Sequence, residues 1–478
     1  MVGLENWQIA TPEIILAAGA MALLMIGVFR GERSADLVAW LSIALLIGTA
    51  AAVIWGDAGT AFGGLFLNTP FTMAMKVLSL LGSALAILMS GSFMRREGAW
   101  RFEYPVIIVL ATVGMMIMLS AADLMTLYVG LEMQSLALYV VAAFQRDSAR
   151  STEAGVKYFV LGAVASCMML YGSSLVYGFG GTTNFVGIAK VFAAGAPPVG
   201  AVVGLVFILA GLVFKVSAVP FHMWTPDVYE GAPTPVTALF SVAPKIAALG
   251  LLVAVVMGPF RPLMAQSQQI LVMVSVASMA WGAFAAIRQE NIKRLMAYSS
   301  IANMGYALLG LAAGTEEGIR SVVIYMIIYL AMSVGTFACI LSMRRGGIAV
   351  ERIADLGGLW RNHPRMALAL LFFMFSMAGI PPLAGFFGKL NVFLAAINAG
   401  LYWASALGVA ASVVGAYYYL RIIKVMFLDD PVAPFDAVEL PMGSVMAVTA
   451  IFIFPVFLVF QSPFIATAQA AAHAFFAR

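Results

Sequence analysis

The chain has 478 residues, of which 63% are hydrophobic and only 10% are charged. Its mean hydropathy of +1.00 excludes a soluble globular domain, because stretches of about 20 apolar residues recur along the whole length. The formal net charge of +4 comes from short basic loops, so it bears on membrane topology and not on nucleic-acid binding. Cys167 and Cys339 lie in apolar stretches without metal-ligand spacing, which argues against an iron–sulfur or structural zinc site.

Hydropathy predicts about fourteen membrane-spanning helices, so the expected fold is an all-α polytopic membrane protein. Span seven, at 199–229, and span twelve, at 364–398, contain internal prolines and are expected to be broken. A short helical tail at 463–476 is expected after the last span. In chain order the spans are 12–29, 37–55, 71–93, 104–121, 124–144, 154–179, 199–229, 235–257, 268–287, 295–313, 319–343, 364–398, 402–427 and 440–461.

The basic residues fall on alternate loops. The richer side carries Arg30, Arg33, Arg95, Arg96, Arg101, Arg146, Arg150, Arg288, Lys293, Arg294, Arg344, Arg345, Arg352, Arg361, Arg365, Arg421 and Lys424. The other side carries only Lys190, Arg261, Arg320 and Arg478. The positive-inside rule places the richer side in the cytoplasm and both termini outside. The amino-terminal flank contains Glu5 and Glu13 but no basic residue, so we expect it to precede a span rather than form a cleaved signal.

Lysines occur where the chain is expected to be buried in lipid. A charge at that depth costs at least about 2.5–3.5 kcal/mol, so such residues usually face the bundle interior and serve ion or proton pathways. Broken helices beside such charges indicate transport machinery. Lys215 lies close to Pro220, and Lys245 directly follows Pro244. The five lysines within the predicted spans are Lys76, Lys157, Lys215, Lys245 and Lys389.

Several acidic and basic groups in or near the spans admit more than one interpretation. Glu132 lies in the middle of span five, where a carboxylate is expected to have a lysine partner. Lys245 is a relay candidate, with a purely structural ion pair to Glu132 as the alternative. Lys76 and Lys157 lie near the starts of their spans, and Lys76 is expected to extend to the membrane interface, as Lys157 also could. Asp123 is expected to cap the start of span five.

Other polar groups lie at or just after the break in span seven. His222 lies two residues after Pro220, and a structural hydrogen bond there is as good an explanation as a role in proton transfer. Asp227 and Glu230 are expected chiefly to shape the turn into span eight, with a role at the cytoplasmic entrance as the alternative.

The spacing of the two broken spans predicts a repeat. Spans seven and twelve are five apart, which predicts two five-span units, and an odd number of spans makes the units inverted relative to each other. The expected organisation is a three-helix segment at 1–103, a first repeat of spans four to eight at 104–258, a second repeat of spans nine to thirteen at 259–428, and span fourteen with its tail at 429–478.

Three motifs carry a resemblance to a known family. Phe-Lys followed by Pro-Phe-His-Met-Trp-Thr-Pro-Asp-Val-Tyr-Glu-Gly-Ala-Pro-Thr-Pro-Val-Thr-Ala, at 214–238, resembles the broken seventh helix of the antiporter-like subunits of respiratory complex I. Gly-Ile-Pro-Pro-Leu-Ala-Gly-Phe-Phe-Gly-Lys, at 379–389, resembles their broken twelfth helix, and Leu-Glu-Met-Gln-Ser-Leu, at 131–136, their fifth-helix glutamate motif. Tyr-Glu-Gly-Ala-Pro-Thr and Ser-Val-Ala-Pro-Lys resemble the bacterial subunit N group, the counterpart of mitochondrial NADH dehydrogenase subunit 2.

The resemblance implies a proton relay. In it, Glu132 and Lys215 are the charge pair of the fifth and seventh helices. Lys245 is the central lysine of the eighth helix, and Lys389 is the terminal lysine that exchanges protons with the outside. The implied function is membrane-arm proton translocation in an NADH:quinone oxidoreductase, with no redox chemistry in this chain.

The resemblance also implies secondary site residues, cofactors and partners. Lys157 matches the sixth-helix lysine, and His222 the histidine beside the seventh-helix break. NADH, FMN, iron–sulfur clusters and quinone are expected in other subunits, and no cofactor or metal in this chain. The expected partners are other membrane subunits of complex I, including a neighbouring antiporter-like subunit, together with the lipid bilayer and protons, but no nucleic acid. The expected location is the bacterial cytoplasmic membrane, with both termini periplasmic.

Three rival functions remain open from the sequence. A subunit of a multi-subunit Na⁺/H⁺ antiporter would share the broken helices. A stand-alone transporter of a small molecule would need one internal substrate site, whereas the polar residues here are spread along the chain. A purely structural assembly subunit would tolerate replacement of its lysines without loss of pumping.

Overall fold

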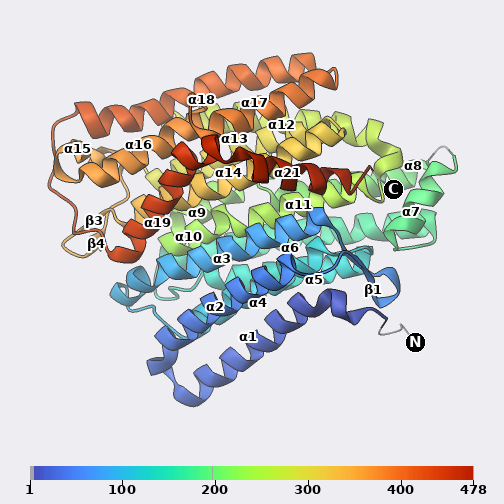
Figure 1. The fold of residues 1–478 in the computed structure, drawn as a ribbon, viewed down its shortest axis with the longest axis horizontal. Coiled ribbons are helices and arrows are strands. Elements are labelled where there is room, and N and C mark those ends of the chain that lie inside the picture. The colour runs from blue at the N-terminus through green and yellow to red at the C-terminus, as the bar shows by residue number, and fades with distance from the viewer. Residues whose placement is uncertain (1–4, 196, 477–478) are drawn as a thin grey trace.

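The computed structural model describes residues 5–195 and 197–476, and in it long helices run side by side along one axis (Figure 1). Within those residues, eleven helical segments are long and apolar enough to cross a membrane, and four shorter apolar helices accompany them. The predicted all-α membrane fold is thereby confirmed. The strands form two small antiparallel hairpins, one of β1 (Gly59–Ala61) with β2 (Phe66–Asn68) and one of β3 (Arg344–Arg345) with β4 (Ile348–Ala349).

The helices are named in chain order. They are α1 (Thr11–Arg30), α2 (Ala35–Ile54), α3 (Pro70–Arg96), α4 (Glu103–Leu119), α5 (Leu124–Ala142), α6 (Ala149–Gly180), α7 (Phe185–Ala193), α8 (Val199–Lys215), α9 (Trp224–Gly231), α10 (Thr234–Ser241), α11 (Ala243–Met257), α12 (Met264–Ala286), α13 (Ile292–Ala312), α14 (Glu316–Leu341), α15 (Leu359–Asn362), α16 (Pro364–Ala378), α17 (Ala384–Asn398), α18 (Tyr402–Leu428), α19 (Leu440–Ile451), α20 (Phe457–Val459) and α21 (Gln461–His473). Short 3-10 turns, such as η4 (Arg261–Leu263), join some of them.

Polar side chains mark where several helices begin. The Asp123 carboxylate accepts a hydrogen bond from the backbone N–H of Met125 at 2.7 Å, which confirms its expected role as the cap of α5. Asn291 does the same for α13, accepting from the N–H of Lys293 at 2.8 Å. These caps satisfy backbone donors that the first turn of a helix leaves free, so they fix where each helix starts.

Both predicted breaks are present, and the structure adds a third. Span seven is divided into α8 and α9, and span twelve into α16 and α17. Span eight, expected at 235–257, is present as one apolar segment at Thr234–Met257, but its helix is interrupted at Val242 between α10 and α11. Pro244 lies in the first turn of α11 and has no N–H to extend the ladder of α10, so a new helix starts there.

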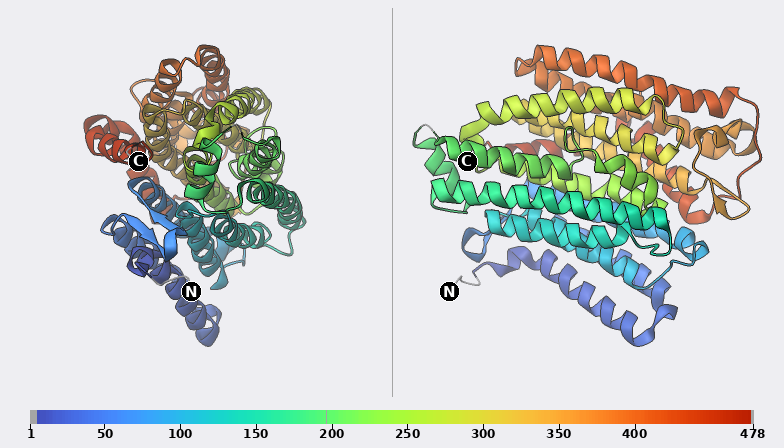
Figure 2. Two further views of the ribbon diagram at one scale, coloured as in Figure 1. Left: turned by 90° about the vertical axis from the view of Figure 1, so that its right-hand side faces the viewer. Right: turned by 180° about the vertical axis from the view of Figure 1, so that it is seen from behind.

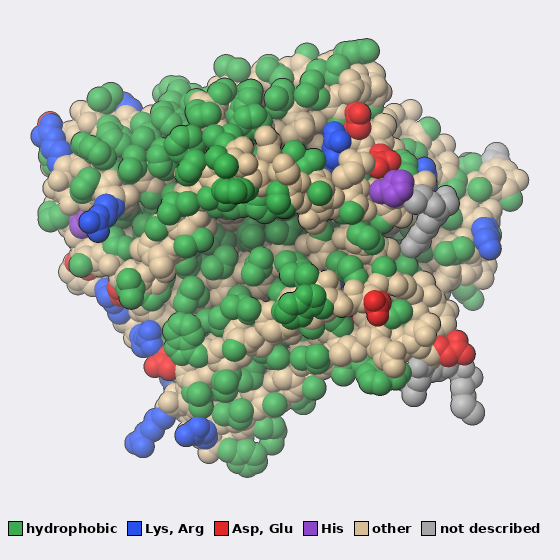
Figure 3. Space-filling model, in the orientation of Figure 1, with side chains coloured by type: hydrophobic (Ala, Val, Ile, Leu, Met, Phe, Trp, Pro, Cys, Tyr) green, Lys and Arg blue, Asp and Glu red, His purple; other side chains and the backbone are tan. Residues whose placement is uncertain are grey.

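The two ends of the bundle differ in charge. The described ends of the chain lie at the same end of the bundle, seen end-on in the left panel of Figure 2. Lysine and arginine side chains gather mainly at the opposite end, at the left of Figure 3, while the flank between is largely apolar. This agrees with the predicted alternation of basic and non-basic loops.

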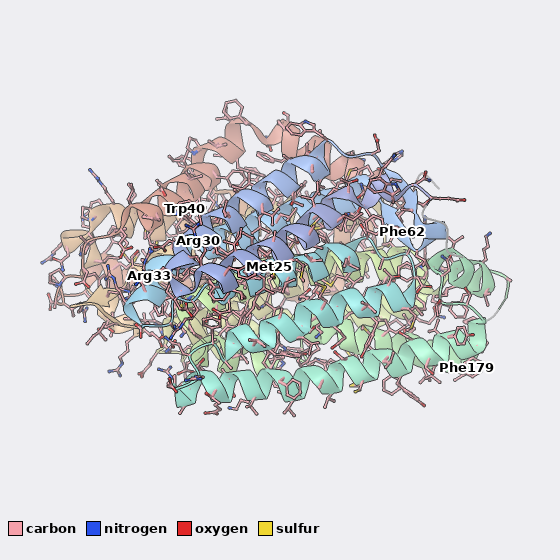
Figure 4. The ribbon with its side chains drawn as sticks, turned by 90° about the horizontal axis from the view of Figure 1, so that it is seen from below. Met25, Arg30, Arg33, Trp40, Phe62 and Phe179 are labelled. Atoms are coloured by element: carbon pink, nitrogen blue, oxygen red, sulfur yellow. The ribbon has the colours of Figure 1, made fainter. Side chains whose placement is uncertain are left out.

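The outer surface of α1 and α2 is apolar along its length. Met25 and Trp40 are exposed there, and Arg30 and Arg33 lie toward the basic end of the molecule (Figure 4). Phe62 lies toward the other end. An apolar band with arginines at one border is what a helix pair in contact with lipid or with a neighbouring membrane subunit requires.

Candidate functional site

Lys215 is the last residue of α8 and lies where the helix opens. Its Nζ donates a hydrogen bond to Ser135 Oγ at 2.7 Å and lies 3.5 Å from the hydroxyl oxygen of Tyr139, both on α5. The residue is only 7% exposed. The free carbonyls at a helix C-terminus carry partial negative charge, so the break favours an ammonium group at this point.

Side chains satisfy the backbone groups that the break exposes. The indole Nε1 of Trp224 donates to the carbonyl oxygen of Phe214 at 3.2 Å. The N–H of Val219 donates to Ser278 Oγ, on α12, at 2.9 Å. A broken helix is tolerated at membrane depth only where protein or water supplies such partners. Sequence reasoning did not single out Trp224 or Ser278.

Glu132 and Lys215 are not in ion-pair contact. Among the described residues, no Lys or Arg nitrogen lies within 4.0 Å of the Glu132 carboxylate, whose buried Oε1 has no hydrogen-bond partner. Lys215 instead reaches Ser135, which lies one turn along α5 from Glu132 on the same face. Lys215 therefore contacts a serine of α5 and not the Glu132 carboxylate itself, and the functional charge pair implied by the resemblance stays a prediction.

Lys245 is buried in the middle of the bundle without a carboxylate. It is 1% exposed, and its Nζ donates to Ser300 Oγ, on α13, at 2.5 Å. The ring of Tyr229 lies 5.1 Å from the nitrogen, and Ser300 also hydrogen-bonds the hydroxyl of Tyr329 on α14 at 2.7 Å. Within the described chain Lys245 makes no ion pair, so the alternative of a structural pair with Glu132 is wrong.

Lys389 binds the end of the other broken helix. Its Nζ donates to the carbonyl oxygens of Met377 and Ala378, the last two residues of α16, at 2.8 and 3.2 Å. It also donates to Ser412 Oγ on α18 at 2.9 Å, and lies 4.7 Å from the ring centre of Tyr306. The lysine on α17 therefore spans the break and compensates the negative end of α16.

A polar face of α13 lies between Lys245 and Lys389. Ser299 hydrogen-bonds the Tyr419 hydroxyl at 2.5 Å, and Asn303 accepts from the Tyr325 hydroxyl at 2.7 Å. The polar residues of this face follow one another along α13 at intervals of one, three and three residues, which places them on one side of the helix. The helix itself is almost wholly buried. Sequence reasoning missed this face, although polar residues at helical spacing within an apolar span were a readable signal. Its members are Ser299, Ser300, Asn303 and Tyr306.

Lys157 is not buried among apolar residues. Its side chain is 41% exposed and pairs with Glu153 at 2.7 Å and with Asp227 at 2.9 Å. Arg294 in turn pairs with Asp227 at 2.8 Å and with Glu230 at 3.0 Å. Lys157 lies near the start of α6, within reach of these charges, and its place in the relay stays a prediction.

The polar cluster around Lys157 encloses a cavity of about 230 Å³. Asp227 and Glu230 both line this cavity, so the alternative of a role at the cytoplasmic entrance stays open. Its charged lining residues are Arg150, Glu153, Lys157, Asp227, Glu230 and Arg294.

A loop next to this cluster carries a further acid. Glu351 accepts from Lys293 at 2.9 Å and from the Asn291 amide at 2.9 Å. Burial acts to raise the pKa of Glu351, but the neighbouring Lys293 and Asn291 outweigh it and hold that pKa below its usual value.

His222 lies in the opening between α8 and α9. It is half-buried, its Nδ1 is buried without a hydrogen-bond partner, and its ring packs edge-on against Trp281 at 5.8 Å between centres. The structure thus shows His222 beside the helix break with one ring nitrogen unbound. Its role in proton transfer stays a prediction.

Lys76 was expected to extend to the membrane interface, and this is wrong. It is 1% exposed, and its Nζ lies 2.6 Å from the carboxylate of Glu13 on α1. Asn68 accepts a second hydrogen bond from it at 3.1 Å. The sequence showed Glu13 only as an acid near the amino terminus, because nothing local reveals that α1 and α3 bring these two positions together.

The described residues contain no group of three or more His, Cys, Asp or Glu side chains placed to hold a metal ion. Cys167 and Cys339 are both free thiols, one exposed and one buried.

Comparison with known proteins identifies the family. The family model described as NADH:quinone oxidoreductase/Mrp antiporter, TM, matches residues 121–415. The chain belongs to this family. NADH-quinone oxidoreductase subunit N of Rhodospirillum rubrum is 56% identical to it over 470 residues, which cover 97% of this chain and 96% of the relative. NADH-quinone oxidoreductase subunit N 1 of Rhizobium meliloti is 57% identical over 479 residues, 99% of each chain.

Solved structures agree with this family membership. A chain of respiratory complex I from Thermus thermophilus is 30% identical, with a TM-score of 0.82 over 96% of this chain and 99% of that chain. A chain of the Mrp complex from a Dietzia species superposes with a TM-score of 0.86 over 98% of both chains, but at 22% identity. The second likeness shows the fold alone.

Proposed function

We propose that this chain is a membrane-arm subunit of a proton-pumping NADH:quinone oxidoreductase and that it moves protons through its buried lysines. The observation that carries the proposal is the state of Lys215, Lys245 and Lys389. Each is buried, each donates to a serine hydroxyl, and within the described chain none has a carboxylate within 4.0 Å. The relatives named NADH-quinone oxidoreductase subunit N support the assignment to that complex.

The arrangement of hydrogen-bonding groups supports stepwise proton transfer. A charged lysine can only donate hydrogen bonds, whereas serine and tyrosine hydroxyls both donate and accept, so these hydroxyls can pass a proton from one lysine toward the next. In our proposal a charge change in a neighbouring subunit acts on Glu132 and Lys215, and Lys215 then transfers a proton toward Lys245. The polar face of α13 carries it on to Lys389, which releases it outside. Each proton moved against a potential of 100 mV requires about 2.3 kcal/mol.

The remaining assignments follow from the same proposal. The charged cavity around Lys157, Asp227 and Glu230 is the entrance from the cytoplasm, and His222 assists transfer at the break. The chain lies in a bacterial cytoplasmic membrane with both termini periplasmic, and its two inverted units are 104–258 and 259–428. Neighbouring membrane subunits, one of them antiporter-like, are its partners, and electron transfer with NADH, FMN, iron–sulfur clusters and quinone takes place in other subunits.

A Na⁺/H⁺ antiporter subunit is the second candidate, because the family description covers both kinds of complex and the Dietzia Mrp chain has the same fold. Native separation of solubilised membranes followed by an NADH-oxidation stain distinguishes the two. We expect the chain to migrate in a large complex with NADH dehydrogenase activity. Migration in a smaller assembly without that activity would favour the antiporter.

The relay itself is tested with Lys215→Ala, against Lys424→Ala as a control for an exposed lysine. We expect Lys215→Ala to reduce proton pumping per NADH oxidised by about tenfold or more, since a positioned proton-transfer group contributes at least that much. Complex assembly is expected to be unchanged. Normal pumping at wild-type levels of the complex would show that Lys215 is not in the relay.

A further inference from the structure

A cavity with cations in an otherwise mostly apolar lining lies at the end of the bundle opposite the basic loops. The cavity measures about 570 Å³ and lies between the start of α3, the ends of α4 and α11, helix α7 and the residues just after α21. Its lining is mostly apolar, from residues such as Leu119, Phe185 and Met257. Volumes of this size suit a small molecule or a section of a larger apolar one.

Two cations line this otherwise apolar cavity. Lys190, in the last turn of α7, and Arg261, in η4, both contribute to the lining, and no Asp or Glu does. Both side chains belong to exposed residues, and among the described residues neither forms an ion pair. This side of the predicted topology holds only four basic residues. The cavity brings two of them together, which concentrates positive charge there.

Arg261 is held in place. Its guanidinium donates to the carbonyl oxygen of Phe475 at 2.8 Å and stacks over the ring of Phe476 at 4.8 Å. One planar face and one N–H are thus occupied, and the remaining donors are free to bind an anion. A fixed guanidinium loses little conformational freedom on binding, which strengthens recognition.

Helix α7 has the form of a helix lying at a membrane surface. Its apolar residues Phe185, Ile188 and Phe192 are buried against the bundle, while Val186 and Val191 are exposed. A short amphipathic helix with a terminal lysine lies naturally where acyl chains meet headgroups. The lining therefore combines apolar residues with two cations, the two kinds of contact that the acyl chains and the phosphate of a phospholipid make.

We propose that this cavity binds an anionic phospholipid, with an acyl chain in the apolar lining and the headgroup phosphate between Lys190 and Arg261. The ligand is a lipid of the leaflet at the end of the bundle where the described chain ends lie. Basic pockets between membrane helices attract anionic headgroups through such charges. The absence of any acidic lining residue removes the repulsion that an anion would otherwise meet.

The test uses the whole complex in nanodiscs of phosphatidylcholine. Two probes carry the same photoreactive diazirine in an acyl chain, one on phosphatidylglycerol and one on phosphatidylcholine, and labelled peptides are mapped by mass spectrometry. We expect the anionic probe to label 185–193 and 254–262 preferentially. Each of Lys190→Gln and Arg261→Gln is expected to reduce that preference by about fivefold.

Two matched variants complete the design. Arg320→Gln removes a cation that lies on the same side of the predicted topology but does not line the cavity. This substitution is expected to leave labelling unchanged. Ala189→Phe fills the cavity without changing charge, and is expected to reduce labelling by both probes. Equal labelling by the two probes, absence of label from both segments, or photolabelling that survives both glutamine substitutions would overturn the proposal.

Discussion

Lys76 and Lys245 are equally buried, but their surroundings differ in kind. Lys76 is paired with the Glu13 carboxylate at 2.6 Å, whereas Lys245 has only the Ser300 hydroxyl at 2.5 Å and an aromatic ring. A buried ion pair compensates its own charge and is costly to break. A buried lysine without a carboxylate has no such fixed compensation, so its charge can respond to a neighbour. The comparison separates a group that holds helices together from one suited to carry a proton.

The largest effect is expected from breaking the N-terminal pair. Glu13→Ala leaves the Lys76 ammonium buried and uncompensated, which costs about 3–5 kcal/mol. We expect less assembled complex in the membrane and a lower melting temperature, both measurable after mild solubilisation. The double substitution Glu13→Leu with Lys76→Met replaces both charges by apolar groups and is expected to restore assembly. If Glu13→Ala were fully stable, the pair would not hold α1 on α3.

Replacing the central lysine is expected to have the opposite effect on stability. Lys245→Met removes a charge that costs about 2.5–3.5 kcal/mol at membrane depth, so the complex should be as stable as the wild type or more so. Proton pumping measured in membrane vesicles is nevertheless expected to be lost. A Lys245→Met complex that assembles poorly would mean that this lysine, like Lys76, has a structural partner.

A smaller effect is expected from the serine that binds Lys245. Ser300→Ala removes a hydrogen bond to a charged group, worth about 1.5–3 kcal/mol, and also cuts the contact with Tyr329. We expect slower pumping with the same NADH oxidation by the complex. Ser300→Thr keeps the hydroxyl and serves as the control; if both variants pumped alike, the hydroxyl would have no part in the path.

The smallest effect is expected from the pair at the basic end, Lys293 with Glu351. The pKa of Glu351 is lower in the folded protein than in the unfolded chain. The pair therefore stabilises the folded state fully when the pH is above the pKa that Glu351 has in the unfolded chain. This contribution is lost as the pH falls through the lower pKa of the folded protein. Glu351→Gln should therefore cost about 1 kcal/mol near pH 7 and little at acidic pH. Melting curves of the complex between neutral and acidic pH test this, and an equal cost at every pH would contradict it.

Local sequence patterns were sufficient for much of the architecture. Apolar runs identified the all-α membrane fold, and prolines identified the breaks around Lys215 and Lys389. Pro244 was also visible in the sequence, but the interruption of span eight at Val242 was not predicted. Proline is well tolerated in the first turn of a helix, so Pro244 alone did not show that a new helix, α11, starts there. The polar face of α13 was readable at helical spacing and was overlooked.

The partners of the buried charged groups could not be predicted from the sequence. Glu13 and Lys76 are far apart in the chain, and the partner of Lys215 is Ser135, on the same helix as Glu132. The sequence by itself determined which segments are buried in the membrane, where they break and which lysines they carry, because these depend on hydropathy and on the missing N–H of proline. Only the tertiary structure decided which lysine has a carboxylate, since that depends on which helix faces pack together.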